Sequence, residues 1–376
     1  MMRAWQINLQ AHLGGGEVFT AFLTRALSRL GVPSTLFVHR DAGFWRSLAL
    51  APDNELVPVA DAGEIAQWLP PQVPGQRAWL LSHGPLPARL RDTVHLRTAI
   101  AHMPPQGRDP RAFEHHDLVF GVSNWVLDGL RAAQAPAWDE PLYGVAEARG
   151  DATAPLHAQA PYEFDPRKLR DRALSVFHPV LSSLEGKPRF RKLPGLTLGI
   201  VSRLTPIKQF PEQFALLAPL LAQRGVNLEI FGAGGYASVR DLKRALAPLG
   251  ARARFWGHQD NVAAAYGGLD YLMTGLPEKE ALGLNVIEAQ SCGLPALAVA
   301  APPFTETVLE GSTGFLYRDP RADGGADFAR LLDELLAGRP RPDPRLARAH
   351  LERFTFDAFC ARVERAVQAV RDRVAA

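Results

Sequence analysis

Two glutamates beside a glycine have the residue types and the spacing to bind a sugar nucleotide. Glu280 and Glu288 stand eight positions apart, with Gly283 between them. If a helix begins near Gly283, Glu280 lies in the preceding loop and Glu288 lies about a turn and a half inside the helix. The amides of Gly283, Leu284 and Asn285 then remain free at a helix N-terminus, where they suit an anionic group. The carboxylate of Glu288 can accept hydrogen bonds from a ribose diol, and that of Glu280 from sugar hydroxyls.

Other candidate residues follow short apolar runs that read as strands. In parallel sheets covered by helices, ligands bind at the carboxyl ends of the strands, so the loops after Leu9, His102, Val201, Phe231 and Thr274 are the places to examine. These loops or strand ends supply Gly15 and Gly16, His102, Arg203 and Lys208, and Gly232 and Gly234. Taken alone, each has a structural explanation as well, as a turn, a core histidine or an exposed cation.

Strand-like and helix-like runs alternate almost from end to end, which predicts an α/β fold with parallel sheets. In the first half the expected strands are 4–9, 35–39, 78–82, 98–102 and 118–122, with a helix over 17–30. In the second half strands are expected at 196–201, 227–231, 253–256, 271–274 and 296–299. The helices expected there span 210–224, 239–249, 262–267 and 284–292.

The alternation is interrupted once, which divides the chain into two domains. Residues from about 133 to 194 are rich in Ala, Pro and charged residues, with a short helix possible only over 168–177. We therefore predict an N-terminal Rossmann-like domain over 1–185, with an irregular region at about 133–185. A C-terminal Rossmann-like domain follows over 186–355, and the helix 356–376 is expected to return to the N-terminal domain.

The glutamate segment resembles a known family signature. Residues 280–289 read Glu-Ala-Leu-Gly-Leu-Asn-Val-Ile-Glu-Ala, and the family-4 retaining glycosyltransferases of GT-B fold carry Glu-x-Phe-Gly-(four residues)-Glu-Ala. Leu282 replaces the usual Phe, and Lys279 is atypical beside Glu280. Residues 200–208, Ile-Val-Ser-Arg-Leu-Thr-Pro-Ile-Lys, resemble the family's Gly-Arg-Leu-(three residues)-Lys motif, with Ser202 in place of Gly. The likeness is good over 196–319 and departs from the family's short connector over 143–193.

The resemblance implies a GT-B fold, in which two Rossmann-like domains face each other across a cleft. It implies that Arg203 and Lys208 neutralise the donor diphosphate, and that Glu280 and His102 contact the reacting sugar, so that these four residues form the catalytic set. The same likeness extends donor binding to Gly15, Gly16, Gly232, Gly234, Gly283, Leu284, Asn285 and Glu288. His83 is a weaker candidate on the acceptor side.

The implied reaction moves a sugar from a nucleotide diphosphate to an acceptor hydroxyl with retention of configuration. The acceptor is a saccharide, a lipid-linked compound or another hydroxyl compound, and bacterial surface-polysaccharide or glycoconjugate synthesis is the commonest setting for such enzymes. No Asp-x-Asp triplet occurs, so we expect no metal and no cofactor beyond the nucleotide sugar itself. Arg203, Lys208 and the helix N-terminus at Gly283 can supply positive potential instead.

Composition sets outer limits on function. The chain of 376 residues is 47% hydrophobic and 22% charged, which is typical of globular proteins, and its length suggests about two domains. Its formal charge of +3, from 42 basic and 39 acidic residues, gives no reason to expect nucleic-acid binding. Two cysteines exclude a disulfide framework. With no signal-like or membrane-spanning apolar run, we expect a cytoplasmic protein and leave peripheral contact with the inner membrane face open.

Three other functions stay open on the sequence. A nucleotide-sugar epimerase of GT-B fold would use the same donor pocket without an acceptor. A dinucleotide oxidoreductase is suggested by Gly232-x-Gly234-x-x-Ala237, although Arg252 stands about where that fingerprint needs an acidic residue. A non-catalytic sensor of sugar nucleotides would bind the donor without turnover.

Overall fold

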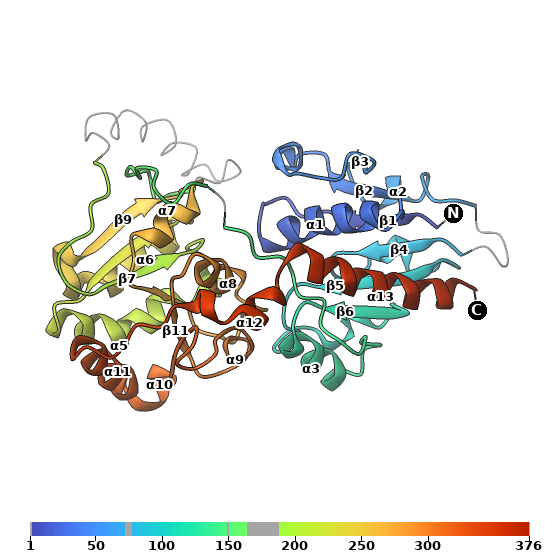
Figure 1. Cartoon of the computed structure of the whole chain (residues 1–376). Helices are drawn as coiled ribbons and strands as arrows, with labels where there is room; N and C mark the ends of the chain where they lie inside the picture. The colour runs from blue at the N-terminus through green and yellow to red at the C-terminus, as the bar shows by residue number, and fades with distance from the viewer. Residues whose placement is uncertain (1, 72–76, 149, 164–187, 376) are drawn as a thin grey trace. The chain divides into compact units, whose positions relative to one another are not determined.

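The computed structural model describes residues 2–71, 77–148, 150–163 and 188–375. The chain divides into two compact units, one made of Met1–Val145 with Glu352–Ala376 and the other of Ala146–Leu351. Each unit contains a six-stranded parallel sheet (Figure 1). The predicted α/β class with two Rossmann-like halves is therefore confirmed.

The sheet of the first unit has the strand order β3-β2-β1-β4-β5-β6. Its strands are β1 (Ala4–Asn8), β2 (Ser34–His39), β3 (Glu55–Val59), β4 (Trp79–Ser82), β5 (Leu96–Ala101) and β6 (Leu118–Gly121). Its α-helices are α1 (Gly15–Arg29), α2 (Ala62–Ile65), α3 (Asn124–Ala132) and α13 (Phe356–Ala375). Helix α12 (Arg348–Glu352) belongs to the second unit except for its last residue, where the chain returns to the first. Short 3-10 turns cover η1 (Gly43–Ser47), η2 (Ala88–Leu90) and η3 (Pro110–Phe113).

Among the elements of this unit that were not predicted, strand β3 and helix α3 each have a physical reason for their place. Strand β3 carries Pro58, whose ring removes a backbone donor, and it lies at the edge of the sheet where that loss is tolerated. Helix α3 lies in the stretch before the irregular region. Its N-cap is Ser123, whose hydroxyl accepts a hydrogen bond from the amide of Val126 at 3.1 Å.

Helix α13 completes the first unit although it comes last in the chain. It runs beside α1 (Figure 1), with the rings of Phe19 and Phe359 in edge-to-face contact at 5.2 Å. At the surface of the same pair of helices, Arg29 donates to Asp357 at 2.6 Å. Four apolar residues at helical spacing form its buried stripe, namely Phe359, Val363, Val367 and Val370.

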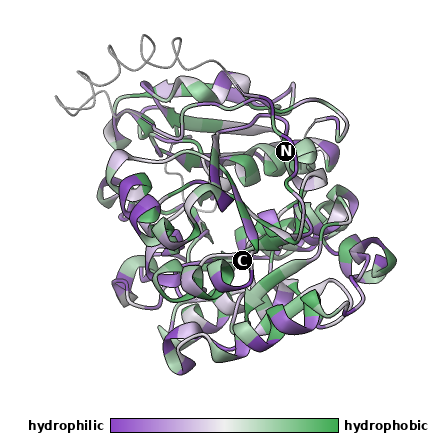
Figure 2. Ribbon diagram, turned by 90° about the vertical axis from the view of Figure 1, so that its left-hand side faces the viewer, coloured by the Kyte–Doolittle hydropathy of each residue, from purple (hydrophilic) through white to green (hydrophobic). Residues whose placement is uncertain are grey.

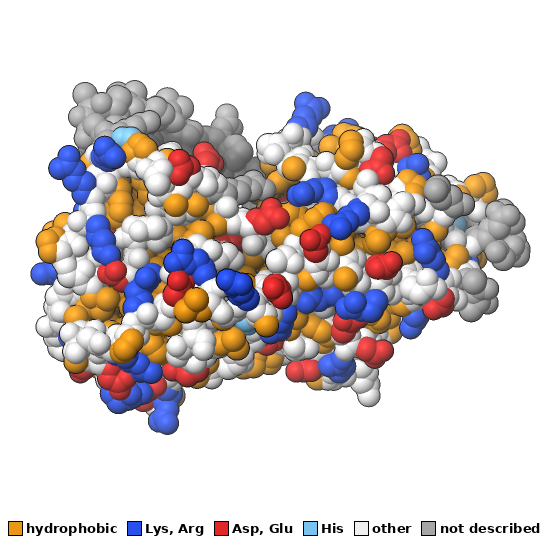
Figure 3. Space-filling view, viewed as in Figure 1, with side chains coloured by type: hydrophobic (Ala, Val, Ile, Leu, Met, Phe, Trp, Pro, Cys, Tyr) orange, Lys and Arg blue, Asp and Glu red, His pale blue; other side chains and the backbone are white. Residues whose placement is uncertain are grey.

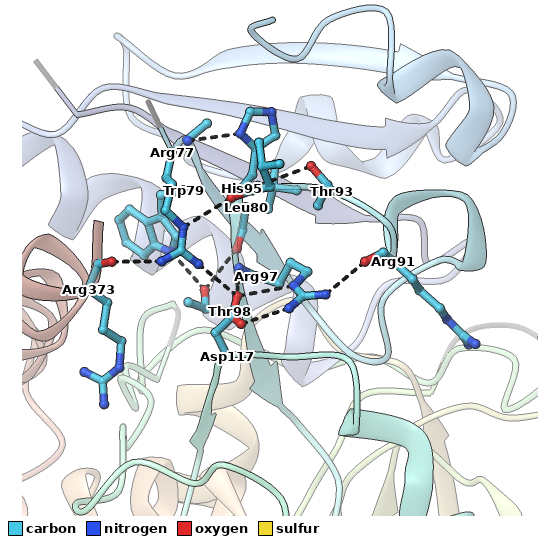
Figure 4. A network of polar contacts seen from close by, with 12 residues as sticks. Arg77, Trp79, Leu80, Arg91, Thr93, His95, Arg97, Thr98, Asp117 and Arg373 are labelled. Atoms are coloured by element: carbon cyan, nitrogen blue, oxygen red, sulfur yellow. Dashed lines mark hydrogen bonds and ion pairs between the residues drawn. The ribbon is translucent and has the colours of Figure 1, made fainter. Parts of the chain in front are cut away.

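The amino ends of β4, β5 and β6 are joined by a polar network (Figure 4). Asp117 accepts hydrogen bonds from the backbone and guanidinium of Arg97 and pairs with Arg77 at 3.6 Å. Burial by itself would raise the pKa of Asp117, but the hydrogen bonds from Arg97 outweigh it and lower the pKa. Arg77 also donates to the carbonyl of Arg373 in α13. The network lies at the edge of the sheet opposite the predicted ligand-binding edge, so we assign it to stability.

The sheet of the second unit has the order β12-β11-β10-β7-β8-β9. Its strands are β7 (Thr197–Val201), β8 (Asn227–Phe231), β9 (Ala253–Gly257), β10 (Tyr271–Met273), β11 (Ala296–Val299) and β12 (Gly314–Tyr317). Its α-helices are α5 (Phe210–Gln223), α6 (Tyr236–Ala245), α7 (Val262–Gly267), α8 (Leu284–Ser291), α9 (Phe304–Thr307), α10 (Pro320–Asp323) and α11 (Ala326–Leu336). The 3-10 turns are η4 (Pro206–Lys208), η5 (Ala247–Arg252) and η6 (Pro344–Leu346).

Both faces of this second sheet are covered, as parallel sheets require. Leu198 and Ile200 pack into one apolar cluster with α5, whereas Val201 and Phe231 belong to a second cluster with Trp256. Helices in Figure 2 carry both green and purple residues, which is the pattern of helices with one apolar face. On the face shown in Figure 3, basic and acidic side chains are interspersed over each unit.

The division between the units comes earlier in the chain than the predicted domain boundary. The predicted domain boundary between residues 185 and 186 and the expected helix over 168–177 both lie outside the described residues. Residues 146–163 already pack on the second unit: Gln159 donates its amide to Trp256 O at 3.0 Å, and Glu163 to Gly234 O at 2.8 Å. The composition of this segment is irregular, so its attachment to the second sheet depends on backbone bonds that no local pattern reveals. Among the described residues, no helix combines the length and apolar character needed to span a membrane.

Candidate functional site

The order of the second sheet creates a switch point between β7 and β10. From β7 the chain proceeds through β8 and β9 on one side, whereas β10, β11 and β12 extend on the other. The connections after the two neighbouring strands therefore diverge and leave a crevice at their carboxyl ends, where open α/β sheets bind ligands. The structure brings the predicted cations after β7 and the predicted glutamates after β10 to this position.

The loop after β7 contacts the loop after β10 through backbone and side chains. Lys208, at the end of η4, forms an ion pair with Glu280. The backbone carbonyl oxygen of Lys208 accepts a hydrogen bond from the amide of Leu276 at 3.2 Å. A Cβ atom added to Gly275 would lie 2.0 Å from the same carbonyl oxygen. Glycine is therefore required for the close approach that pairs Lys208 with Glu280. Arg203 is exposed two residues after the end of β7.

Glu280 is held in a turn ahead of α8. Its amide donates to the carbonyl of Pro277 at 2.9 Å, and its carboxylate accepts from the amide of Ala281 at 3.3 Å as well as from Lys208. The Glu280 and Lys208 side chains are 17% and 21% exposed, so both remain partly accessible to a ligand. The pair can thus present one anionic and one cationic group to a ligand.

Helix α8 begins as predicted, at a glycine that no other residue could replace without strain. Gly283 is its N-cap with φ 83°, and a Cβ there would lie 3.2 Å from the ring of Phe304. Among the described residues, none accepts a hydrogen bond from the amides of Gly283, Leu284 and Asn285. The Asn285 side chain donates to Val201 O at 3.2 Å, which ties the first turn of α8 to the end of β7. Three donors at a helix N-terminus form an arrangement suited to a phosphate.

Glu288 has a partner that sequence reasoning missed. The hydroxyl of Tyr266, at the end of α7, lies 3.1 Å from Oε2 of Glu288 and 3.3 Å from the carbonyl of Asn285. Burial raises the pKa of Tyr266 well above its ordinary value, and the charge of Glu288 adds to this effect. Burial and Glu288 likewise raise the pKa of Cys292. Tyr266 falls within a predicted helix, and nothing in its spacing indicates a contact with residue 288.

Gly232 and Gly234 allow two loops to approach each other closely. Their amides donate to Gly257 O at 2.7 Å and Pro161 O at 3.0 Å, so neither amide is left for a phosphate in this arrangement. A Cβ on Gly232 would lie 1.9 Å from Ser202 O, and one on Gly234 would lie 2.0 Å from Leu204 O. The two glycines thereby set the position of the backbone on either side of Arg203.

The remaining predicted residues, Gly15, Gly16 and His102, belong to the first unit. Gly15 and Gly16 open α1, and His102 follows β5, so all three lie at the carboxyl edge of the first sheet. A Cβ on Gly16 would lie 3.5 Å from Cγ of His102, which places the histidine ring against the glycine turn. The ring of Phe19 packs edge-to-face on His102 at 5.1 Å.

His102 is also linked to His83, which follows β4 on the neighbouring strand. Nδ1 of His83 lies 3.0 Å from Nε2 of His102 and 3.0 Å from the hydroxyl of Thr20, and Nε2 of His83 lies 3.1 Å from Oε1 of Gln6. Asn8 donates to the same Thr20 hydroxyl at 3.1 Å. Gln6, Asn8 and Thr20 lie on a predicted strand and a predicted helix, and their polarity at buried positions was the signal available in the sequence.

Both histidines are neutral at pH 7. Burial lowers the pKa of His102 to about 4. Burial also lowers the pKa of His83 well below its ordinary value, with a further contribution from His102. A neutral imidazole of such low basicity is suited to hydrogen bonding and poorly suited to removing a proton at pH 7.

A family model matches this chain. Residues 189–349 match the model described as glycosyl transferases group 1. D-inositol 3-phosphate glycosyltransferase of Mycolicibacterium vanbaalenii is 34% identical over 153 residues, which cover 38% of this chain and 32% of the relative. N-acetyl-alpha-D-glucosaminyl L-malate synthase of Bacillus anthracis is 30% identical over 130 residues, 34% of each chain. The matched region thus spans about a third of the length of these curated relatives.

Solved structures show the same fold over the whole chain. HepE of Anabaena, in complex with UDP-glucose, has a TM-score of 0.66 at 15% identity and covers 98% of this chain and 100% of its own. Sucrose-phosphate synthase of Thermosynechococcus elongatus has a TM-score of 0.67 at 16% identity, with 99% and 100% coverage. These likenesses establish the GT-B fold.

Proposed function

Because residues 189–349 match the family model of the group 1 glycosyl transferases, we propose that this chain transfers a sugar from a nucleotide-diphosphate donor to an acceptor hydroxyl. The observation that supports this most is the crevice at the β7/β10 switch point. There Lys208, Glu280 and the amides that open α8 come together on adjacent loops. A diphosphate carries the negative charge that this combination of an ammonium group and helix amides attracts.

The charges in this crevice suggest how the leaving group is stabilised. Arg203 and Lys208 neutralise the diphosphate as the bond from the sugar C1 to the phosphate oxygen breaks. Lys208 is paired with Glu280 in the structure. When a donor binds, the ammonium group of Lys208 therefore donates hydrogen bonds to both the phosphate and Glu280. This leaves lone pairs on the Glu280 carboxylate that can accept hydrogen bonds from sugar hydroxyls. Positioned cations of this kind serve in place of a metal ion in the proposed reaction.

Glu288 is proposed to bind the ribose of the donor. Its carboxylate lies about one turn inside α8, and Tyr266 fixes one of its oxygens. A carboxylate accepts several hydrogen bonds, so Glu288 can also accept from a ribose diol, which is a pair of donors. This role explains why the buried hydroxyl of Tyr266 contacts the carboxylate of Glu288, which lies on the same helix as the proposed phosphate-binding amides.

The proposed transfer retains the configuration of the sugar. The acceptor oxygen bonds to C1 on the face that the phosphate leaves, and the proton of the acceptor hydroxyl passes to the departing phosphate oxygen. No protein nucleophile is required by this route. His102 is neutral and weakly basic, so its proposed role is a hydrogen bond to a hydroxyl of the reacting sugar.

Two alternatives remain weaker candidates. A GT-B epimerase would form product without an acceptor, which the product assay below distinguishes from transfer. A dinucleotide oxidoreductase would use the amides of Gly232 and Gly234 for a pyrophosphate, whereas here both amides bond within the protein.

Thermal unfolding with nucleoside diphosphates tests the donor site. UDP is the first probe, because the HepE structures contain it, followed by GDP and ADP. A ligand at about 100 times its Kd stabilises the folded state by about 2.7 kcal/mol. We expect one diphosphate to raise Tm, Glu288→Gln to abolish most of the rise, and Glu334→Gln on α11 to leave it unchanged. Failure of all three diphosphates to raise Tm would refute the donor site.

Product analysis tests the reaction. The full chain is incubated with the nucleotide sugars of the stabilising base and a panel of saccharide and lipid-linked acceptors, with and without EDTA. We expect acceptor-dependent product in equal amounts in the two conditions, with the anomeric coupling of the donor retained in the product NMR spectrum. Product without an acceptor would favour epimerisation, and inverted product would contradict the proposed mechanism.

A further inference from the structure

The buried hydrogen bonds around His83 determine which nitrogen of His102 carries its proton. His83 is 8% exposed and makes three polar contacts, to Gln6, Thr20 and His102. A neutral imidazole has one donor and one acceptor nitrogen. The partners of each nitrogen therefore decide the tautomer.

The first step concerns Gln6. Its Oε1 atom lies 3.1 Å from Nε2 of His83, whereas its own Nε2 is buried without a hydrogen-bond partner. An amide oxygen only accepts hydrogen bonds, so with the Gln6 amide in this orientation Nε2 of His83 carries the proton. Because His83 is neutral, its Nδ1 is left as an acceptor.

The second step concerns the two groups that face this acceptor, namely the Thr20 hydroxyl and Nε2 of His102. The Thr20 hydroxyl lies 2.8 Å from the carbonyl of Gly16, one turn earlier in α1, and that carbonyl can only accept. The single hydroxyl proton of Thr20 has two acceptors within reach, this carbonyl and Nδ1 of His83, while its oxygen accepts from Asn8. Nε2 of His102 lies 3.0 Å from the same Nδ1, and two unprotonated ring nitrogens at that distance would repel each other, so Nε2 of His102 carries a proton.

The geometry of the two rings agrees with such a bond. Their planes lie within 9° of each other and their centroids are 5.3 Å apart. The nitrogen-to-nitrogen distance of 3.0 Å plus the two ring radii accounts for this separation. The rings are therefore nearly coplanar and joined edge to edge, as an in-plane N–H···N hydrogen bond requires, and they are not stacked face to face.

We propose that His83, anchored by Gln6, is a positioning residue that holds His102 as the Nε2–H tautomer and leaves Nδ1 of His102 as a bare acceptor beside the Gly15–Gly16 turn. A sugar hydroxyl can donate to this nitrogen, whereas a carboxylate or phosphate oxygen would be repelled by it. The site thereby selects a ligand that presents a hydroxyl at this point. This consequence for selectivity rests on the proposed function, but the tautomer itself does not.

The tautomer can be read without any substrate. In the full chain labelled with ¹⁵N-histidine, long-range ¹H–¹⁵N correlation spectra distinguish protonated from unprotonated ring nitrogens. The signals of His102 and His83 are assigned by their loss in His102→Gln and His83→Phe. We expect His102 to show protonated Nε2 and unprotonated Nδ1, and His83 to show protonated Nε2.

Variants test whether His83 imposes this state. His83→Phe and, as a second route if that protein does not fold, Gln6→Leu should each introduce signal from Nδ1–H at His102. They should lower kcat about 10-fold or more while leaving the nucleoside diphosphate Tm shift unchanged, since a misplaced reacting group affects the rate chiefly. His39→Gln, at the end of β2 in the same sheet, is the matched control and should change neither.

Three results would overturn the proposal. The first is a protonated Nδ1 at His102 in the unmodified protein. The second is a His102 tautomer that stays unchanged in both variants. The third is a changed tautomer with unchanged kcat, which would remove its consequence for the reaction. A protein that binds no nucleoside diphosphate would instead refute the donor site and leave the tautomer result intact.

Discussion

Replacing Gly232 with alanine adds a methyl group where two loops of the second unit nearly touch. The new Cβ would lie 1.9 Å from Ser202 O, whereas real Cβ atoms essentially never come closer than 3.0 Å to another atom. The backbone must therefore move by more than 1 Å. The Gly232 amide is bonded to Gly257 O and the Ser202 amide to Phe231 O, so the strain falls on the loop that continues into Arg203.

The size of the effect follows from this displacement. Overpacking of a well-packed region costs about 1–3 kcal/mol, and each kcal/mol lowers Tm by about 2–4 °C in a unit of 150–250 residues. Gly232→Ala should therefore lower Tm by about 2–12 °C. A shift of about 1 Å in a reacting group can cost about 100-fold in rate, so we expect kcat/KM to fall by about that factor in the variant that remains folded.

Gly235→Ala is the matched control in the same loop. Gly235 has φ −60° and a Cβ there meets no atom within 4 Å. Alanine reduces the freedom of the unfolded chain, so Gly235→Ala should leave Tm unchanged or raise it by the equivalent of about 0.4–1 kcal/mol. Thermal melts and initial rates on the two variants test the reasoning. Equal behaviour of Gly232→Ala and Gly235→Ala in both assays would refute it.

Three further predictions concern side chains. Tyr266→Phe removes the hydrogen bond to Glu288; because such bonds to charged groups contribute about 1.5–3 kcal/mol, the Kd of the nucleoside diphosphate in calorimetry should rise about 10-fold or more. Lys208→Met removes a cation beside the leaving phosphate and should lower kcat about 100- to 1,000-fold in steady-state assays. The folded state disfavours protonation of His102 and His116, whose pKa values burial lowers from 6.5 to about 4. The free energy of unfolding in urea should therefore fall as the pH is lowered from 6.5 towards 4, by on the order of 3 kcal/mol per histidine.

Each of these predictions has its own control. Tyr271→Phe on β10 should leave the Kd unchanged, and equal losses in the two tyrosine variants would contradict a specific role for Tyr266. Lys243→Met on α6 removes the same charge from the surface and should retain kcat; if Lys208→Met retains it too, Lys208 does not act on the leaving group. His116→Gln should flatten the pH dependence of stability, and an unchanged slope would show that His116 does not contribute to it.

Most of the fold could be predicted because its strands are buried on both faces. The run 296–299 is continuous and apolar, and the run 227–231 carries Leu228, Ile230 and Phe231 at buried positions; the structure has strands with those same bounds. The edge strands β3 and β12 were not predicted because both are short and each has a residue that weakens the strand pattern. Strand β3 contains Pro58, and strand β12 begins with Gly314. Edge strands need less burial, so the signal that identifies a strand is weakest there.

The parts of the candidate site that lie within one continuous segment could be predicted from the sequence. The contacts between elements far apart in the sequence could not. The segment from Glu280 to Glu288 indicates its own helix and its own glycine cap. The Lys208–Glu280 pair follows from the family motifs only in outline, because their contact depends on which strands are neighbours. Tyr266 and Gln6 act on residues 22 and 77 positions away, and no local pattern indicates such partners.

The place of α13 in the first unit has a consequence for synthesis on the ribosome. Residues Ala146–Leu351 are contiguous, so the second unit has its whole sequence as soon as position 351 has been made. The first unit lacks Phe359 and the rest of the stripe that covers α1 until the last 25 residues follow. Domains generally fold as units during synthesis, the N-terminal one first. In this chain the later-encoded unit can finish folding before the earlier one, whose apolar α1 surface stays uncovered until α13 has been made.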